Sequence, residues 1–360
     1  MGRKVLHLIG QLVRGGAERQ LVYLSQCLSE RGWAQAVVTF NPGDVWEEKL
    51  VSQGVPVLHI PRSKSKLLRL ARLNLLAARE HPQLIHSWSH HTNVYARWML
   101  ACRSVPKIFS FRSNPLIDSF SGTSRERVSN AEVYSAAACI VSNSQASLDA
   151  ARAGGVRMRR TAVVGNIAYP RGRATPGKTG GVFRVVAVGA LTPLKGFDTL
   201  LRSVAILEKK GQSLQLVVLG DGPERARLLE LREQLGLSDL VTFRGSVDNV
   251  PEILSEAHLL VHPSRCEGLS NSVLEGMGEG LPVVATKVGG TPELISNELQ
   301  LVLPDSPGEL AEKILAMMGD PDTRAALGAA NLRLVSQRCS PDTVTSQYES
   351  IYKSVISSGS

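Results

Sequence analysis

Two glutamates, eight residues apart, enclose a turn with the composition of an anion-binding site. Residues 262–295 read H-P-S-R-C-E-G-L-S-N-S-V-L-E-G-M-G-E-G-L-P-V-V-A-T-K-V-G-G-T-P-E-L-I, with Glu267 and Glu275 on either side of G-L-S-N-S. A helix that starts in this turn leaves up to about four backbone N–H groups without helical partners, and with the helix dipole they attract an anion. Ser270, Asn271 or Ser272 can cap this helix.

The position of the second glutamate suits a ligand that carries a diphosphate and a ribose. In a helix that begins near Ser270, Glu275 lies about 7.5 Å along the axis, at roughly 1.5 Å per residue. A carboxylate there can accept charge-assisted hydrogen bonds from two vicinal hydroxyls. Glu267 is expected to face the far end of the ligand, with Gly268 and Leu269 in the loop between. Taken alone, two glutamates at this spacing are more often solvated residues of an ordinary strand–helix–strand unit.

Lys195 is the candidate cation for the diphosphate. It lies in V-G-A-L-T-P-L-K-G-F-D at 188–198, after a predicted strand that ends in glycine, and V-L-G-D-G-P-E-R at 218–225 repeats that pattern. Glycine lets the backbone approach a ligand at the carboxyl edge of a parallel sheet. Arg244 lies in the segment 243–245, where we expect the nucleotide base to be selected, and is a further candidate donor contact.

The first half of the chain carries a glycine loop and a histidine cluster, each after a predicted strand. G-G-A-E-R-Q-L starts at Gly15 and Gly16, and I-H-S-W-S-H-H-T-N spans 85–93. Zinc is disfavoured at the histidines because the loop has no cysteine and no acidic residue. We expect acceptor contacts there, with capping of the next helix by Thr92 or Asn93 as the alternative. The expected acceptor-binding residues are His86, His90, His91, Asn93 and, after a later strand that reads F-S-F-R, Arg112.

Length and cysteine usage describe an ordinary intracellular globular protein. A chain of 360 residues suits two domains of roughly 170–190 residues each. The five cysteines are scattered without C-x-x-C spacing, which favours a reduced, cytoplasmic compartment. The first ten residues hold an apolar run of only five, so we expect no signal peptide. No stretch approaches the ~18 apolar residues of a membrane span.

Charge is distributed unevenly along the chain. Residues 1–170 contain 22 Lys and Arg against 10 Asp and Glu, a net charge of +12, whereas residues 171–360 contain 19 against 22, a net charge of −3. A basic half joined to a slightly acidic half indicates that the first half meets an anionic partner.

Alternating apolar runs and helical segments predict an α/β protein. Parallel sheets covered on both faces, in two doubly wound Rossmann-like domains facing a central cleft, account for this alternation. The expected domains are residues 1–166 and 182–340, with a Pro- and Gly-rich linker at 167–181 and a terminal helix in 341–360. The expected strands are 5–9, 36–40, 55–60, 84–86, 107–111, 138–142 and 161–164, then 183–188, 214–219, 241–243, 258–261, 282–286 and 300–303.

The motifs of the second half resemble those of the retaining glycosyltransferases of family 4, which have the GT-B fold. The resemblance rests on the E-x7-E spacing and on the flanking P-S-x-x-E-G-L and V-G-G-T-P-E-L-I, and G-G-A-E-R-Q-L in the first half also matches. It implies a first domain that binds the acceptor, a second that binds a nucleotide-diphosphate sugar, expected to be a UDP-sugar, and a C-terminal helix that crosses back to the first. It also implies transfer with retention of anomeric configuration.

The resemblance assigns roles to individual residues. Lys195 and the N–H groups near Ser270–Ser272 stabilise the departing diphosphate, Glu275 holds the ribose, and Glu267 holds the sugar hydroxyls or the developing positive charge. We find no D-x-D motif and expect activity without a divalent metal or any other cofactor. The nucleotide sugar is therefore a co-substrate.

The chain departs from the family pattern at two positions. Ala190 stands where many members carry an arginine that contacts the diphosphate. Arg112 stands where many carry a histidine that contacts the donor sugar. Arginine cannot be a general base, but it can bind sugar hydroxyls, a carboxylate or a phosphate, so Arg112 joins Glu267 and Lys195 as a candidate catalytic residue.

Residues 61–79 combine leucines with basic side chains in P-R-S-K-S-K-L-L-R-L-A-R-L-N-L-L-A-A-R. Such a helix either packs against the sheet with a solvated basic face or lies on an anionic membrane surface. Nucleic acid is disfavoured because aromatic residues are not interleaved with the charges. We expect a glycan or phosphate-bearing lipid acceptor and a cytoplasmic protein, peripheral on the inner face of the plasma membrane.

Three other functions compete with glycosyl transfer. A nucleotide-sugar epimerase on the same scaffold would need no acceptor, and a non-catalytic binding protein is compatible with Ala190 and Arg112. An NAD-dependent dehydrogenase would require G-x-G-x-x-G, and G-D-G-P-E-R lacks the third glycine.

Overall fold

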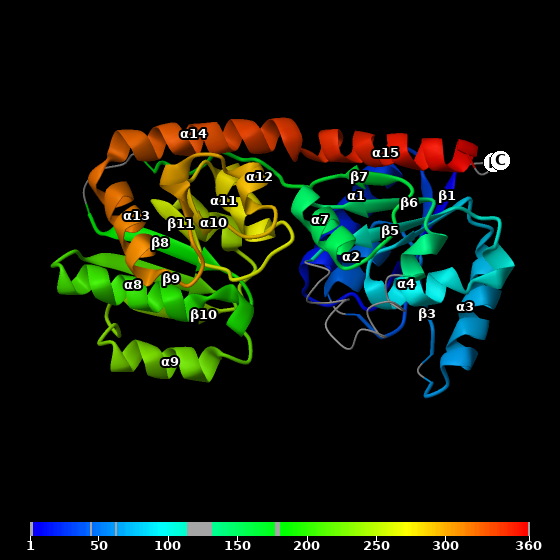
Figure 1. The fold of residues 1–360 in the computed structure, drawn as a ribbon, viewed down its shortest axis with the longest axis horizontal. Helices are drawn as coiled ribbons and strands as arrows, with labels where there is room; N and C mark the ends of the chain where they lie inside the picture. The colour runs from blue at the N-terminus through cyan, green and yellow to red at the C-terminus, as the bar shows by residue number, and fades with distance from the viewer. Residues whose placement is uncertain (1–2, 44, 62, 114–131, 177–180, 359–360) are drawn as a thin grey trace. The chain divides into compact units, whose positions relative to one another are not determined.

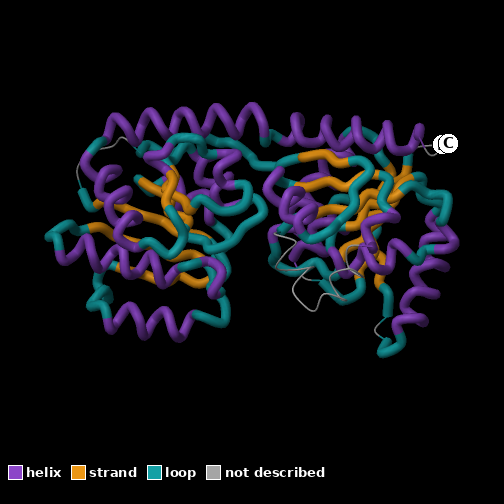
Figure 2. The backbone as a smooth tube through the Cα atoms, in the orientation of Figure 1, coloured by secondary structure: helices purple, strands orange, loops and turns teal. Residues whose placement is uncertain are grey.

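The chain folds into two compact units. The computed structural model describes residues 3–43, 45–61, 63–113, 132–176 and 181–358. Residues 1–167 and 341–360 form the first unit, and residues 168–340 form the second. Each unit has strands at its centre and helices around them (Figure 2). The prediction of two Rossmann-like α/β domains is confirmed.

A seven-stranded parallel sheet forms the centre of the first unit, within its described residues, in the order β3-β2-β1-β4-β5-β6-β7. Its strands are β1 (Lys4–Ile9), β2 (Ala34–Thr39), β3 (Val57–His59), β4 (Leu84–Ser87), β5 (Lys107–Phe111), β6 (Cys139–Ser142) and β7 (Thr161–Val163). Its helices are α1 (Gly16–Glu30), α2 (Val45–Ser52), α3 (Lys66–Glu80), α4 (His90–Arg97), η1 (Leu100–Cys102), η2 (Tyr134–Ala136), α7 (Gln145–Ala153) and α15 (Pro341–Ser358).

Successive residues of the central strands face opposite layers of helices. On β1, Val5 and Ile9 pack with α1, α2 and α15, whereas Leu6 and Leu8 pack with α3, α4 and α7. Because both faces are covered, the strands are mostly apolar rather than alternating. The C-terminal helix α15 belongs to the first of these layers, where it buries Tyr348 and Tyr352.

A six-stranded parallel sheet, within the described residues, forms the centre of the second unit, in the order β10-β9-β8-β11-β12-β13. Its strands are β8 (Phe183–Val188), β9 (Leu214–Leu219), β10 (Val241–Gly245), β11 (Leu259–His262), β12 (Val283–Thr286) and β13 (Leu301–Val302). Its helices are η3 (Pro193–Lys195), α8 (Phe197–Lys209), α9 (Arg225–Gln234), α10 (Val250–Ser255), α11 (Asn271–Glu279), α12 (Thr291–Leu294), η4 (Glu298–Gln300), α13 (Pro307–Gly319) and α14 (Pro321–Arg338).

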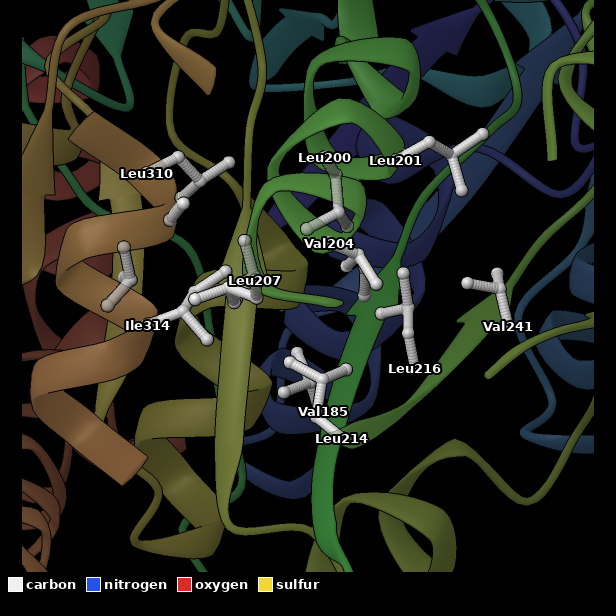
Figure 3. Close-up of a cluster of buried hydrophobic side chains, with 14 of the residues drawn as sticks. Val185, Leu200, Leu201, Val204, Leu207, Leu214, Leu216, Val241, Leu310 and Ile314 are labelled. Carbon is white, nitrogen blue, oxygen red and sulfur yellow. The ribbon is translucent and has the colours of Figure 1, made fainter. Parts of the chain in front are cut away.

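The second sheet is also covered on both faces. Figure 3 shows the layer in which leucines of α8 and α13 meet Val185, Leu214 and Leu216 of β8 and β9. The opposite layer contains α10, α11, α12 and α14. Residues 168–176, within the expected linker 167–181, pack on this unit: Arg171 and Gly172 donate backbone hydrogen bonds to the Gly278 carbonyl at 2.8 and 3.0 Å. Residues 177–180 of that segment lie outside the described residues.

Both sheets reverse their strand order beside their first strand. In the first unit the chain proceeds outward from β1 to β3 and returns to β4 on the other side of β1. In the second unit it proceeds from β8 to β10 and returns to β11 beside β8. The crevice at the carboxyl ends of such a strand pair is the usual ligand site of a doubly wound sheet. The loops after β1 and β4, and after β8 and β11, are therefore the places to look for function.

Candidate active site

Three donors converge on one carboxylate oxygen at the carboxyl ends of β8 and β11. Lys195 Nζ lies 2.5 Å from Glu267 Oε1, His262 Nε2 lies 2.8 Å from the same oxygen, and Ser264 Oγ donates to it at 2.7 Å. Lys195 comes from η3 after β8, and the other three residues come from the end of β11 and its loop. The fold thus places the predicted residues Lys195 and Glu267 in direct contact at the point where the strand order reverses.

The environment of Glu267 keeps its carboxylate ionised. Burial alone would raise the pKa of Glu267, but the hydrogen bond and charge of His262, together with Lys195, outweigh burial and hold the pKa well below its ordinary value. An ionised carboxylate only accepts hydrogen bonds. Glu267 can therefore hold hydroxyl groups or stabilise positive charge, but it cannot supply a proton.

A chain of hydrogen bonds connects this carboxylate to the start of α11. Ser270 is the N-cap of α11, and its hydroxyl accepts from Val273 N at 3.4 Å. The Ser270 and Ser272 hydroxyls lie 2.9 Å apart, and Ser272 Oγ lies 3.3 Å from His262 Nδ1. Because Glu267 can only accept, His262 Nε2 carries a hydrogen and donates it to Glu267. The same ring therefore joins Glu267 to the two serine hydroxyls at the start of α11.

Two glycines allow the loops to approach this closely. Gly196 has φ +63°, and a Cβ there would lie 2.1 Å from the Pro263 carbonyl oxygen. Gly289, in V-G-G-T-P, has φ +52°, and a Cβ there would lie 2.1 Å from the Glu267 carbonyl oxygen. Gly290 N also donates to the Gly268 carbonyl at 2.6 Å. The glycine pair that follows β12 therefore supports the backbone that carries Glu267.

Arg265 fixes the loop that carries Lys195. Its guanidinium donates to Asp198 at 2.9 Å and to Asp305 at 2.7 Å, and it also donates to the Pro193 carbonyl at 2.5 Å. These bonds join the loop after β11 to η3 and α8. Arg265 is thus held by two carboxylates and supports the loops of the site. It is therefore unsuited to contact the diphosphate in place of the arginine that many family members carry at the position of Ala190.

The other predicted donor residues lie in α11, in the loop before it, or on the outer strand β10. Glu275 is half-buried in the second turn of α11, and Asn271 is the first residue of that helix. Leu269 is buried in the loop before the cap. Arg244 is exposed on β10, which is separated from β8 by β9. Glu267, Lys195, Ser270 and Ser272 are therefore joined by contacts, while Arg244 lies apart from them.

In the first unit, Arg112 lies against two neighbouring aromatic rings. Its guanidinium carbon is 4.5 Å from the centre of the Trp88 ring and 5.7 Å from that of Tyr348. It donates to the Tyr348 hydroxyl and, at 3.3 Å, to Asn166 Oδ1. Burial raises the pKa of Tyr348, although Arg112 opposes that rise. The C-terminal helix α15 thus orients Arg112 after β5.

Two of the predicted acceptor residues have no exposed surface. His86 is fully buried on β4, where its ring nitrogens contact the Tyr352 hydroxyl at 2.6 Å and Ser110 Oγ at 2.7 Å. Burial, with the charges of His7 and Arg112, holds the pKa of His86 well below its ordinary value of 6.5. Asn93 is also fully buried, in α4. In this structure neither His86 nor Asn93 is exposed to an acceptor. His86 lies on a strand buried on both faces, which turns each side chain into a helix layer, and Asn93 lies on the buried side of α4.

The remaining acceptor residues of that loop retain some exposure. His90 is half-buried and its Nδ1 lies 3.1 Å from the Tyr134 hydroxyl, whereas His91 is exposed and contacts the rings of Phe40 and Tyr95. Ser89, rather than the expected Thr92 or Asn93, caps α4, and Thr92 completes a capping box with it.

Gly15 and Gly16 begin α1 after the loop that follows β1. Gly15 is the N-cap residue and Gly16 the first residue of the helix. This places both at the carboxyl edge of the first sheet, beside the strand-order reversal between β1 and β4.

Sequence reasoning did not single out His262, Ser264, Trp88 or Tyr348. The sequence contains a feature that indicates His262, because a histidine at the last position of a buried strand lies at the ligand-binding edge of the sheet. No such feature indicates Tyr348, because the sequence does not reveal that a residue 236 positions away contacts Arg112. Among the described residues, no group of three or more His, Cys, Asp and Glu is placed to hold a metal ion.

Family models and known proteins match this chain. A model described as "Glycosyl transferase 4-like domain" matches residues 15–166, and one described as "Glycosyl transferases group 1" matches residues 182–320. The lipopolysaccharide core biosynthesis glycosyltransferase LpsD of Rhizobium meliloti (strain 1021) is 29% identical, over 97% of this chain and 98% of its own. One component of the human phosphatidylinositol N-acetylglucosaminyltransferase is 26% identical, over 83% of this chain and 64% of its own.

A solved structure shares the whole fold. Anabaena Alr3699/HepE in complex with UDP has a TM-score of 0.83 and 23% identity, with 98% of this chain and 100% of that chain covered. The two parallel-sheet units and the site after β8 and β11 define a glycosyltransferase with the GT-B fold. The two matching models together span most of the chain, which belongs to glycosyltransferase family 4, so the resemblance seen in the sequence is confirmed.

Proposed function

We propose that this glycosyltransferase takes a hexosyl or N-acetylhexosaminyl group from a UDP-sugar and transfers it, with retention, to a glycan or phosphate-bearing lipid in cell-surface glycan biosynthesis. Three similarities support the proposal. LpsD is named for lipopolysaccharide core biosynthesis, the human relative for N-acetylglucosaminyl transfer to phosphatidylinositol, and HepE has been solved with UDP and with UDP-glucose.

The contact between Lys195 and Glu267 is the observation that carries this proposal. Lys195 Nζ lies 2.5 Å from an ionised, nearly buried carboxylate, beside a helix start capped by Ser270. An anionic diphosphate at that helix start attracts Lys195, while the carboxylate attracts sugar hydroxyls and positive charge. A nucleotide-diphosphate sugar presents both chemistries in one molecule, and a plain phosphate or an uncharged glycan does not.

In the mechanism that we propose, the bond between the anomeric carbon and the diphosphate oxygen breaks first. Lys195 and the N-terminus of α11 stabilise the charge that develops on the departing diphosphate. Glu267 stabilises the positive charge on the sugar ring. The acceptor hydroxyl bonds to the anomeric carbon on the face that the diphosphate leaves, and its proton passes to the departing diphosphate. Retention then requires no protein nucleophile.

The proposed reaction needs no divalent metal, since Lys195 and the helix start supply the positive field at the diphosphate. Transfer is expected to be unchanged when a chelator such as EDTA is added. Sugar transfer by the purified protein, assayed with and without chelator, checks this. Loss of transfer on chelation, with recovery on addition of Mg²⁺ or Mn²⁺, would contradict it.

We also place the reaction in the cytoplasm, at the inner face of the plasma membrane. No disulfide joins the five cysteines, all of which lie among the described residues, and this supports a reducing compartment. The net charge of +12 on residues 1–170 supports contact with an anionic surface. No helix in the described ranges is both long and apolar enough to span a bilayer.

The identity of the donor can be tested by thermal stabilisation. UDP, GDP and their sugars are screened against the wild type and against Glu275→Ala and Lys195→Ala. UDP-sugars are expected to raise the melting temperature of the wild type, and both variants are expected to lose most of this rise. Glu312→Ala and Lys209→Ala, at exposed positions of α13 and α8, are matched controls that retain it. Equal stabilisation of the variants and their controls would overturn the donor site, and preference for a GDP-sugar would overturn the choice of base.

A further inference from the structure

Helix α3 exposes an apolar stripe on its outer side. Leu67, Leu68 and Leu75 are 78%, 43% and 56% exposed, while Leu73 and Ala77 on the inner side are fully buried. Ala71 and Ala78 are also exposed and continue the stripe at helical spacing. A helix that covers a sheet ordinarily presents polar residues outward. Because α3 is apolar on both sides, packing against the sheet does not account for its outer leucines.

The stripe continues onto the short helix η1. Ala101 N donates to Asn74 Oδ1 at 2.8 Å, which fixes η1 against α3. On either side of Met99, Trp98 is 54% exposed and Leu100 is 73% exposed. We call Leu67, Leu68, Leu75, Trp98 and Leu100 the α3–η1 surface. Figure 1 shows α3 at the outer edge of the first unit.

The segments that carry this surface are predominantly basic, and Glu80 at the end of α3 pairs with Lys4 at 2.8 Å. Residues 63–79 contain five Lys and Arg and no Asp or Glu, and residues 97–104 contain two Arg and again no acidic residue. Lys64, Lys66, Arg79 and Arg103 are exposed. The Arg97 guanidinium lies 5.5 Å from the centre of the Trp98 ring. Exposed leucines and a tryptophan within a ring of cations match the layers of an anionic bilayer, acyl chains below charged headgroups.

We propose that the α3–η1 surface binds the face of an anionic lipid bilayer. Leu67, Leu75 and Leu100 enter the acyl region, Trp98 lies at the headgroup level, and the lysines and arginines meet the lipid phosphates. A protein partner would need acidic residues placed to match the exposed cations, whereas an anionic bilayer satisfies the leucines, the tryptophan and the cations without such a match. The inference does not depend on the donor or acceptor of the reaction.

Co-sedimentation with vesicles tests the proposal on the full chain. Vesicles of phosphatidylcholine alone are compared with vesicles that also contain phosphatidylglycerol. The wild type is expected to sediment with the anionic vesicles and to be released as the salt concentration rises. The triple variant Lys64→Gln, Lys66→Gln, Arg79→Gln and the triple variant Leu67→Ser, Trp98→Ser, Leu100→Ser are each expected to bind at least about tenfold more weakly.

Matched controls test whether the location of the substituted side chains matters, or only the loss of charge or of apolar side chains. Arg202→Gln, Lys209→Gln, Lys210→Gln removes the same charge from exposed sites of the second unit, and Val182→Ser, Leu299→Ser, Leu303→Ser removes exposed apolar side chains there. Both controls are expected to bind as the wild type does. Thermal unfolding and stabilisation by UDP, without vesicles, verify that all four variants are folded.

Three outcomes would overturn the proposal. The first is binding that does not depend on the phosphatidylglycerol content. The second is equal loss of binding in the surface variants and their controls. The third is a wild type that forms dimers without lipid, while the Leu67→Ser, Trp98→Ser, Leu100→Ser variant is monomeric, because the surface would then be an interface between two copies of the chain.

Discussion

Three hydrogen-bond donors on one oxygen constrain the Glu267 carboxylate tightly. Only 10% of its side chain is exposed, and Lys195, His262 and Ser264 all contact Oε1. Removing a nearly buried charge leaves its partners uncompensated, which is costly in a low-dielectric environment. The same arrangement that prepares the residue to meet a sugar therefore also stabilises the fold.

The ionised state of Glu267 predicts a specific pH dependence of stability. Folding lowers its pKa, so the stabilisation is complete above the ordinary value of 4.5 and is lost as pH falls toward the lower folded value. The wild type is expected to exceed Glu267→Gln in free energy of unfolding by about 2 kcal/mol at pH 7 and by clearly less at pH 4. Urea unfolding followed by circular dichroism measures both.

Glu256→Gln serves as the control for this titration. The Glu256 side chain is 73% exposed and its nearest cation, on Arg184, is 3.6 Å away. This variant is expected to resemble the wild type at both pH values. An advantage of the wild type over Glu267→Gln that is as large at pH 4 as at pH 7 would refute the assignment.

His262 is expected to be a positioning residue for the donor. Without its ring, Lys195 loses its main competitor for Glu267 and is held there more tightly, away from an incoming diphosphate. His262→Phe should weaken UDP binding about tenfold, the equivalent of one charge-assisted hydrogen bond. His262→Gln should recover part of the affinity, since its amide can still donate to Glu267. Isothermal titration with UDP gives the values.

A second histidine at the other end of the same strand provides the comparison. His258 precedes β11 and its Nδ1 accepts from Arg184 N at 3.0 Å, at the edge of the sheet opposite to the site. His258→Phe should leave UDP affinity unchanged. If His262→Gln bound UDP no better than His262→Phe, the positioning role would be excluded.

At the scale of elements, the site depends on the close approach of three loops. The loop after β8 meets that after β11 at Gly196, and the loop after β12 meets it at Gly289. Arg265 adds ion pairs to Asp198 and Asp305 across the same junction. Side chains on separate loops hold a fixed geometry only if the loops themselves are fixed, and these contacts provide that.

Gly289→Ala is therefore expected to damage the site from the backbone. Its Cβ would lie 2.1 Å from the Glu267 carbonyl oxygen, at a φ of +52° that L residues rarely adopt. The variant should lose at least about 2 kcal/mol in free energy of unfolding and most of its stabilisation by UDP. Gly308→Ala, in the first turn of α13 with no atom within 4 Å of its Cβ, should be neutral or slightly stabilising. Equal behaviour of the two variants would contradict this explanation.

The sequence predicts elements well here and side-chain surroundings poorly, for physical reasons. All thirteen expected strands occur in the described residues within a few positions, because buried parallel strands are continuous apolar runs that local composition reveals. Lys195 and Glu267 belong to one site because strand ends converge at a reversal of strand order, but the sequence did not predict their direct contact, since Glu267 was expected at the far end of the ligand. His86 shows the limit: whether a polar residue at a strand end faces a ligand or a helix depends on packing from distant segments, here Tyr352 of α15.

At the scale of the whole molecule, the two units carry different spectroscopic probes. All four tryptophans, Trp33, Trp46, Trp88 and Trp98, belong to the first unit. Tryptophan fluorescence therefore reports unfolding of the first unit, whereas circular dichroism reports both. This difference allows the stability of each unit to be measured in the intact chain.

Tyr352→Ala should destabilise the first unit alone. Tyr352 is fully buried in α15, and its hydroxyl contacts His86 at 2.6 Å. Its loss should cost the first unit about 3–5 kcal/mol, as for other buried aromatic truncations. The far-ultraviolet transition should separate into an early phase that follows fluorescence and a late phase unchanged from the wild type. Lys353→Ala, at the next and exposed position, should shift neither phase, and a single common shift in Tyr352→Ala would show that the units unfold together.

Helix α15 completes the first unit but lies at the far end of the chain. The first unit is therefore the first to be synthesised and the last to be completed. The strands β1 to β7 leave the ribosome first, yet the apolar face that receives Tyr348 and Tyr352 waits for residues 341–360. At about 5–20 residues per second, the intervening second unit takes roughly 10–35 s to emerge. During that interval the nascent first unit exposes a hydrophobic surface, so the N-terminal half of this protein is the part that chaperones are expected to protect during translation.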